Sequence, residues 1–212
     1  MAFSVVVLAA GKGTRMKSAL PKVLHPVGGV AMVQRIINTA ESLTATAVHL
    51  VYGHGADQLQ ANVSGQQINW CLQAEQLGTG HAVMQTVEHI SDEEDVMILV
   101  GDAPLIKADT LQRLIDVKAS CDLALLTVNL DDPTGMGRII RNDDNIVAIV
   151  EHKDATEAQR AITEINTGMM MMPGKDLKRW LSELNNDNAQ GEYYLTDVIA
   201  MAANEGKVIK AA

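Results

Sequence analysis

The chain has 212 residues, of which 47% are hydrophobic and 20% charged. This length suits one α/β domain with a sizeable core, and the composition argues against a disordered chain. The formal net charge of −9 argues against a nucleic acid partner, and no apolar run reaches the roughly 20 residues that cross a membrane.

The N-terminus and the cysteines indicate the compartment. Residues 1–4 lack the basic region of a signal peptide, and Cys71 and Cys121 form no C-x-x-C pair. Such cysteines are typical of free thiols in a reducing compartment. We therefore expect a cytoplasmic protein.

The first strong pattern lies within residues 4–16. An apolar, β-branched run predicts a buried strand, and the Gly-x-Gly segment 11–13 predicts a phosphate-binding loop after it. Its spacing fits neither a Walker loop nor a dinucleotide fingerprint, which needs a third glycine where Met16 stands. Arg15 and Lys22 follow as fixed charges suited to gripping a triphosphate and stabilising charge during transfer. On glycine spacing alone, a turn with two solvated cations is the alternative.

The next segments alternate between helix and strand patterns. A helix is expected at 31–40, and strands are expected at 47–52, 68–72 and 96–100. Strands separated by helix-length segments predict right-handed crossovers and a mixed, mostly parallel sheet flanked by helices, which is the α/β class. In such sheets the ligand binds beyond the carboxyl ends of the strands.

Two loops at that predicted edge carry polar groups. The segment 73–82, which begins at Gln73, offers amide, hydroxyl and bare backbone groups that suit a pyrimidine edge. Asp102 follows the most apolar strand and is suited to binding a hard cation. The alternatives are that Asp102 caps the helix after Lys107 and that Gln73 is an ordinary polar strand end.

The second half combines strands, a hairpin and helices. A strand is expected at 123–130, and 138–141 and 146–150 are expected to pair about the turn 142–145. A polar helical piece follows 151–154. The remaining expected elements are a strand at 165–172 and amphipathic helices at 175–184 and 193–203.

Residues 8–16 (LAAGKGTRM) and 20–25 (LPKVLH) closely resemble the signature of the sugar-1-phosphate nucleotidyltransferases. Within that group the chain is similar to the uridyltransferase domain of the bacterial bifunctional N-acetylglucosamine-1-phosphate uridyltransferase/glucosamine-1-phosphate acetyltransferases, with matches along nearly its whole length. The resemblance implies a Rossmann-like nucleotide-diphospho-sugar transferase fold, with residues 1–212 forming a single nucleotidyltransferase domain.

The reaction that the resemblance implies is Mg²⁺-dependent transfer of uridylyl from UTP to N-acetylglucosamine-1-phosphate. Its products are UDP-N-acetylglucosamine and pyrophosphate. The attacking phosphate is already ionised, so alignment and charge neutralisation by Mg²⁺, Arg15 and Lys22 are expected to suffice. The alternatives are a related transferase with another base or sugar, and a fragment that binds nucleotide sugars without turnover.

The family's site residues carry over to matching positions. The nucleoside is expected at Leu8, Ala9, Ala10 and Gly11, and the uracil at Gln73, Gly78 and Thr79. Asp102 is the expected Mg²⁺ ligand and, with Val100 and Gly101, an expected nucleotide contact. The sugar is expected at Gly137, Glu151 and Asn166. The segment 188–197 also matches the family, and a structural role is expected for it.

The chain departs from the family's pattern at three points. Val100 and Met136 stand where relatives often have tyrosine. The chain ends at Ala212, before the asparagine that supplies the family's second Mg²⁺ ligand. It also lacks the hexapeptide repeats of the left-handed β-helix acetyltransferase domain, through which the family trimerises. The chain therefore resembles a truncated domain, and a monomeric state with weak or lost activity is the alternative to the family's trimer with full activity.

Overall fold

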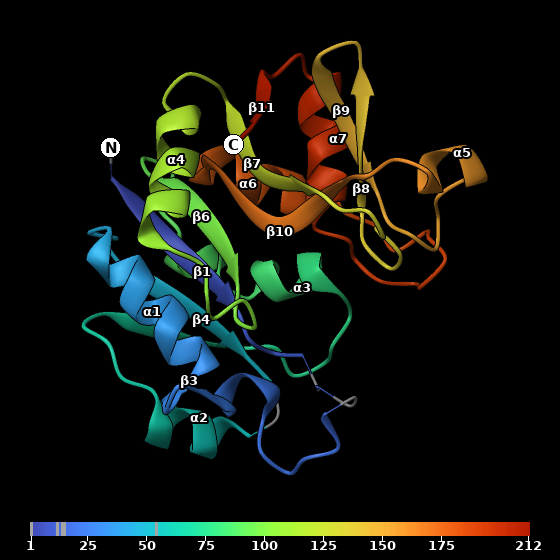
Figure 1. Cartoon of the computed structure of the whole chain (residues 1–212). Coiled ribbons are helices and arrows are strands. Elements are labelled where there is room, and N and C mark those ends of the chain that lie inside the picture. The colour runs from blue at the N-terminus through green and yellow to red at the C-terminus, as the bar shows by residue number, and fades with distance from the viewer. Residues whose placement is uncertain (1, 12, 14–15, 54) are drawn as a thin grey trace.

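The computed structural model describes residues 2–11, 13, 16–53 and 55–212. Its central sheet has the strand order β11-β7-β10-β6-β1-β4-β5, and β8 and β9 form a hairpin attached to β10 (Figure 1). The strands of this sheet are β1 (Phe3–Leu8), β4 (Val48–Tyr52), β5 (Ile68–Leu72), β6 (Asp95–Val100), β7 (Leu123–Asn129), β8 (Arg138–Asn142), β9 (Asn145–Val150), β10 (Glu164–Pro173) and β11 (Ile209–Ala211). A small second sheet pairs β2 (Pro26–Val27) with β3 (Val30–Ala31).

Most strands of the central sheet run in one direction. β1 is parallel to β4 and β6, β4 is parallel to β5, and β11 is parallel to β7. β10 lies antiparallel between β6 and β7. The predicted fold class, a mixed and mostly parallel sheet flanked by helices, is confirmed.

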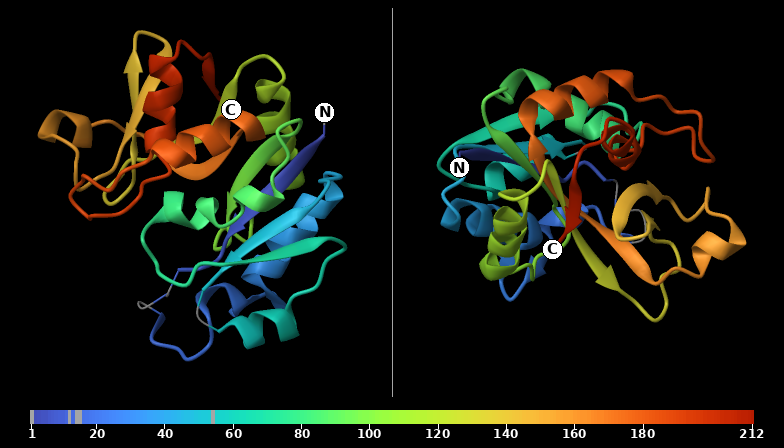
Figure 2. Two further views of the ribbon diagram at one scale, coloured as in Figure 1. Left: turned by 180° about the vertical axis from the view of Figure 1, so that it is seen from behind. Right: turned by 90° about the horizontal axis from the view of Figure 1, so that it is seen from above.

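Helices cover both faces of the sheet (Figure 2). They are α1 (Met32–Ser42), α2 (Ala56–Asn62), α3 (Thr79–Met84), α4 (Ala108–Lys118), α5 (Glu157–Arg160), α6 (Gly174–Glu183) and α7 (Asp197–Asn204), with short 3-10 turns η2 (Lys22–Leu24) and η3 (Val87–His89). Because side chains alternate along a strand, Val5 and Val7 pack with α1, α2 and α4, whereas Val6 packs in the core with α3, α6 and α7. The sheet thus has two buried faces, as continuous apolar strands such as β1 and β6 require.

Two parts of the sequence prediction are corrected. The helix expected at 193–203 begins only at Asp197, because the backbone of Tyr193 is hydrogen-bonded to the loop after β5. The short strands β2, β3 and β11 were not expected, since two or three residues carry too little pattern to distinguish a strand. Within the described residues, no helix is long and apolar enough to cross a membrane.

Candidate functional site

The carboxyl ends of the neighbouring strands bring the predicted loops together. Leu8 at the end of β1 pairs with Val100 at the end of β6, and Gly101 N donates to Leu8 O at 2.9 Å. On the other side, Ala9 N donates to Val51 O at 2.8 Å and Gln73 N donates to Tyr52 O at 2.8 Å. The glycine loop, the loop after β5 and the loop after β6 therefore leave one edge of the sheet.

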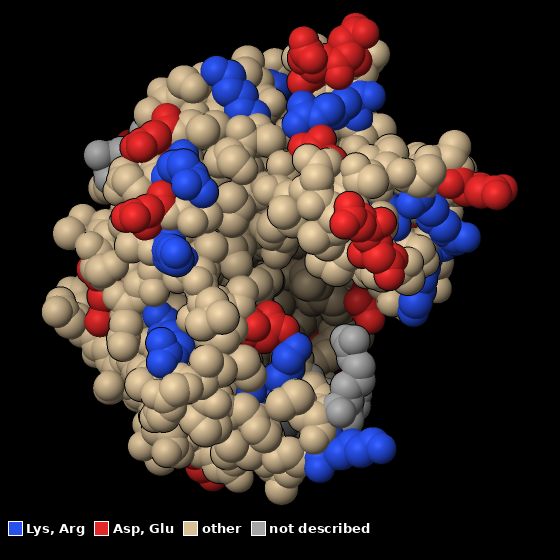
Figure 3. Space-filling view, viewed as in Figure 1, with Lys and Arg blue, Asp and Glu red and all other residues tan. Residues whose placement is uncertain are grey.

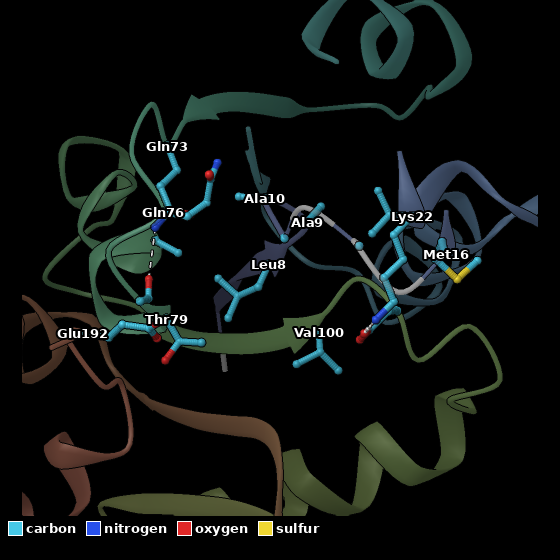
Figure 4. Close-up of a pocket in the computed structure, with 16 residues that line it drawn as sticks. Leu8, Ala9, Ala10, Met16, Lys22, Gln73, Gln76, Thr79, Val100 and Glu192 are labelled. Carbon is cyan, nitrogen blue, oxygen red and sulfur yellow. Dashed lines mark hydrogen bonds and ion pairs between the residues drawn. The ribbon is translucent and has the colours of Figure 1, made fainter. Parts of the chain in front are cut away.

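A cleft lies at this edge, where the space-filling view shows the molecule hollowed with acidic and basic side chains at the opening (Figure 3). Its larger part is a cavity of about 610 Å³ lined by Leu8, Ala9, Ala10, Gly11, Gly13, Met16, Lys22, Val23, Gln73, Gln76, Gly78, Thr79, Ala82, Val100, Asp102 and Glu192 (Figure 4). Its smaller part is a cavity of about 220 Å³ lined by Leu8, Thr79, Val100, Gly135, Met136, Gly137, Glu151, Asn166, Thr167, Gly168, Met170, Leu195 and Thr196. Leu8, Thr79 and Val100 line both parts, so the two cavities adjoin.

The charged end of the larger cavity is formed by Lys22 and Asp102. Their side chains form an ion pair and are 32% and 41% exposed, so both are open to a ligand. Lys22 approaches the glycine loop so closely that a Cβ on Gly13, whose φ is +57°, would lie 2.6 Å from its Cβ. Asp102 does not cap the following helix, because α4 begins after Lys107 without a side-chain cap. That alternative is therefore wrong.

Arg15, the other predicted catalytic cation, lies outside the described residues, as does Lys12. Its role stays a prediction.

The opposite end of the larger cavity presents two glutamine side chains (Figure 4). Gln73 is 3% exposed, and its Nε2 donates to Gly78 O at 3.0 Å and lies 3.1 Å from His81 Nδ1. These contacts fix the amide, so Oε1 is its remaining hydrogen-bonding atom. Burial at the cavity wall distinguishes Gln73 from an ordinary polar strand end.

The smaller cavity contains the three residues predicted to bind a sugar. Asn166 N donates to Gly137 O at 2.9 Å, and Asn166 Oδ1 accepts from Gly168 N at 3.0 Å. Glu151 Oε1 accepts from Thr196 Oγ1 at 3.1 Å. Carboxylate, amide and hydroxyl groups thus meet in one small cavity, a set suited to a polyhydroxylated ligand.

The environment of Glu151 disfavours its charged form. Burial raises the pKa of this carboxyl above its usual value, and the nearby carboxylates of Asp197, Asp154 and Glu192 raise it further. The hydrogen bond from Thr196 acts in the opposite direction. Hydrogen-bond donors on a bound ligand would therefore stabilise the charged form of this carboxyl.

Sequence reasoning did not select several residues that line the cleft. Gln76 lies in the same loop as Gln73, and its buried Nε2 has no hydrogen-bond partner among the described residues. A Cβ on Gly53 would lie 2.7 Å from that nitrogen, so the glycine makes room for the amide. Gln76 was detectable as the second glutamine of the loop. Glu192 and Thr196 carried no comparable local signal, because they reach the cleft from a distant segment.

Within the described residues, the site offers a hard divalent cation one protein ligand, Asp102. Among the described residues, no group of three or more His, Cys, Asp or Glu side chains is arranged to hold a metal. Asp102 already carries a cationic partner, the Lys22 ammonium, at the cleft. Magnesium is commonly held by one or two carboxylates together with substrate phosphates and water, so Asp102 fits as its single protein ligand within the described residues.

The fold and the cleft define an α/β domain with a ligand-binding site beyond the carboxyl ends of its parallel strands. Its sequence places it further: the chain belongs to the family of MobA-like NTP transferase domains, whose model matches residues 5–168. It is 72% identical over 212 residues to the bifunctional protein GlmU of Pseudoalteromonas atlantica, and these residues are 100% of this chain and 47% of that protein. The chain thus spans about half the length of the curated relative it matches.

Known structures share the fold. A Bacillus anthracis protein described as a glucose-1-phosphate thymidylyltransferase superposes with a TM-score of 0.79 at 19% identity, covering 100% of this chain and 86% of that one. A UDP-glucose pyrophosphorylase in complex with UDP-glucose gives 0.77 at 17% identity, covering 99% and 90%. At such identities, the likeness supports the fold alone.

Proposed function

We propose that this chain transfers uridylyl from UTP to N-acetylglucosamine-1-phosphate, giving UDP-N-acetylglucosamine and pyrophosphate. The observation that carries the proposal is the adjacency of two cavities: one has Lys22 and Asp102 at its charged end, and the other contains Glu151 and Asn166. The 72% identity to a bifunctional GlmU protein supports this choice among nucleotidyl transfers.

The chemistry requires positioning more than proton transfer. The attacking oxygen of the sugar phosphate is ionised near neutral pH, so no general base is needed. Lys22 would neutralise charge on the triphosphate as pyrophosphate leaves, and Arg15 is proposed to assist. Asp102 would hold Mg²⁺, which supplies further neutralisation of phosphate charge when bound.

Base and sugar would be read at opposite ends of the cleft. Gln73 Oε1 is suited to accept the N3–H of uracil, because its Nε2 is committed to Gly78 O. Leu8, Ala9, Ala10 and Gly11 line the same cavity and are proposed to surround the nucleoside. Gly78, Thr79 and Val100 also line it and are proposed as further nucleotide contacts. Gly101 is not among the lining residues, and its contact with the nucleotide stays a prediction from the resemblance. Glu151 and Asn166, beside Gly137, are proposed to bind the hydroxyl and acetamido groups of the sugar.

The cofactor, the cellular location and the use of the product are also proposed. We infer Mg²⁺ as the cofactor and the cytoplasm as the location. The product is proposed to be a UDP-sugar precursor for peptidoglycan and lipopolysaccharide.

Comparing nucleotides tests the proposal. The full chain is incubated with Mg²⁺, N-acetylglucosamine-1-phosphate and equal concentrations of UTP, CTP or dTTP, and pyrophosphate release is followed. UTP is expected to give a higher kcat/KM than CTP, because cytosine presents an acceptor at N3 where Gln73 also presents one. Thymine has the same N3–H as uracil, so the expected preference for UTP over dTTP rests on the identity to a GlmU protein. A preference for CTP or dTTP would assign the chain to a transferase with another base.

A further inference from the structure

The segment 192–196 extends from one cavity to the other. Glu192 lines the larger cavity, whereas Leu195 and Thr196 line the smaller one. Asn188 holds the beginning of the segment, because its Oδ1 accepts from Glu192 N at 3.2 Å and its Nδ2 donates to Glu192 O at 2.6 Å. The segment is therefore placed to affect both parts of the cleft.

The segment is paired with the loop that follows β5. Tyr193 N donates to Leu77 O at 2.8 Å, and Tyr193 O accepts from Gly80 N at 2.8 Å. Gly78 lies between these two bonds with φ +113°, and a Cβ there would be 2.5 Å from Tyr193 O. Only glycine permits both this conformation and this close approach.

Thr79 makes a further contact between the loop after β5 and the segment 192–196. Its Oγ1 accepts from Leu195 N at 3.1 Å. Leu195 is 3% exposed, so loss of this acceptor would leave a backbone N–H without a partner in a buried region. The Thr79 hydroxyl therefore fixes the backbone of the segment, and Thr79 itself, the first residue of α3, lines both cavities.

The end of the segment acts on the sugar cavity. Thr196 directly follows Leu195, is 5% exposed, and donates to Glu151 Oε1 at 3.1 Å. Tyr194 adds a second attachment on this side, because its hydroxyl donates to Asp154 Oδ2 at 3.1 Å. With Oε1 held by Thr196, Glu151 presents Oε2 to a ligand.

We propose that Thr79 is a positioning residue for the sugar-phosphate subsite, acting through Leu195 and Thr196 on the carboxylate of Glu151. This inference rests on the proposed function, because it assigns the smaller cavity to the sugar phosphate.

The first test replaces Thr79 by valine, which keeps the shape and removes the acceptor. KM for N-acetylglucosamine-1-phosphate is expected to rise by about threefold to tenfold, the usual consequence of losing one hydrogen bond. KM for UTP is expected to rise less than KM for the sugar phosphate, because valine keeps the backbone and the shape of Thr79 where it lines the nucleotide cavity. Thr79→Ser, which retains the hydroxyl, should restore the wild-type KM.

A matched control separates this effect from general destabilisation. Thr39 lies on α1 away from the cleft, and its hydroxyl donates to Arg35 O at 2.9 Å. Thr39→Val should leave both KM values unchanged. A rise in KM for UTP without a rise in KM for the sugar phosphate in Thr79→Val would show that the hydroxyl serves the nucleotide cavity and not Glu151, and would overturn the inference.

The second test asks whether Thr79 and Thr196 act in one chain of contacts. Calorimetry measures binding of N-acetylglucosamine-1-phosphate in the presence of a methylene analogue of UTP that cannot be cleaved. Thr196→Val and Thr79→Val should weaken this binding to similar extents. The double variant should bind the sugar phosphate with the same affinity as the single variant that binds it less tightly. Additive losses would overturn the inference.

The two proposals fail in different ways. A wild-type chain that releases no pyrophosphate under any condition contradicts the proposed function. Calorimetry still measures the coupling between Thr79 and Thr196, because it follows binding of the sugar phosphate and needs no turnover. An active wild type with an unaltered sugar-phosphate KM in Thr79→Val contradicts only the positioning role.

Discussion

Lys22 and Asp102 neutralise each other across the opening of the larger cavity, although they lie 80 positions apart in the sequence. A triphosphate arriving with its metal ion brings a new partner for each, phosphate for Lys22 and a cation for Asp102. The pair thus holds both side chains in place at the cavity before the substrate binds. Because both side chains are partly exposed, their ion pair contributes little to stability.

Replacing either residue should therefore separate activity from folding. Lys22→Met and Asp102→Asn are each expected to lower kcat/KM for UTP by at least about 100-fold, since each removes a charge that acts on the reacting phosphates. Their thermal midpoints should stay close to that of the wild type. Asp116→Asn, an exposed substitution on α4, is the control. Wild-type turnover in either cleft variant would remove the basis for its assigned role.

Glu151 is predicted to reduce stability at neutral pH. Burial raises its pKa above the usual value near 4.5, and neighbouring carboxylates add to this shift. The pKa of Glu151 is higher in the folded than in the unfolded chain. The neutral carboxyl therefore contributes its full share to the free energy of unfolding at a pH below the pKa of the unfolded chain. This contribution is lost as the pH rises through the pKa of the folded chain.

Glu151→Gln should accordingly be more stable than the wild type at pH 7, and the difference should shrink toward about pH 4. Urea unfolding at both pH values measures this, with the exposed Glu157→Gln on α5 as control. The same variant should bind the sugar phosphate more weakly, because an amide accepts hydrogen bonds less strongly than a carboxylate. An equal difference at both pH values would contradict the assigned cause.

At the scale of elements, an irregularity in β10 shapes the sugar cavity. The pairing of β10 with β7 shifts register between Asn166 and Met170. Within this bulge, Gly168 has φ +80° and donates its N–H to Asn166 Oδ1. Bulges commonly redirect a side chain at a binding site, and here the bulge follows directly on Asn166.

Gly168→Ala should disturb this geometry. A Cβ at Gly168 would lie 2.9 Å from Val100 Cγ1, in addition to the strain of a positive φ. We expect a loss of about 1–3 kcal/mol in the free energy of unfolding and a higher KM for the sugar phosphate. Gly29→Ala is a suitable comparison, because Gly29 has φ +79° and open space around it. If both variants lose the same stability, the contact with Val100 has no effect.

Periodicity predicted most strands and helices because each buries a continuous or alternating apolar face. The hairpin of β8 and β9 and the strands β1, β4, β5 and β6 are confirmed close to their expected ends. The segment 193–196 was wrongly expected to be helical, because its apolar pattern suits a helix while its backbone pairs with residues 77–80. Such tertiary pairing leaves no trace in local periodicity.

At the scale of the whole molecule, the sheet gathers the site from distant parts of the chain. The rule that ligands bind beyond the carboxyl ends of parallel strands correctly predicted that Gly11, Gln73 and Asp102 line one cavity. The rule carried no information on Glu192 and Thr196, which arrive from the segment before α7. Glu192 is held locally by Asn188, four positions earlier. Thr196 is held by Glu151, 45 positions earlier, which only the folded chain brings into reach.

The central claim is that this cleft joins a nucleoside triphosphate to a sugar phosphate with the help of a divalent cation. Pyrophosphate release from UTP and N-acetylglucosamine-1-phosphate, measured on the 212-residue chain with Mg²⁺ and with EDTA, tests it most directly. Release that requires both substrates and stops with EDTA is the predicted result. No release with Mg²⁺, or release that EDTA leaves unchanged, would contradict the account.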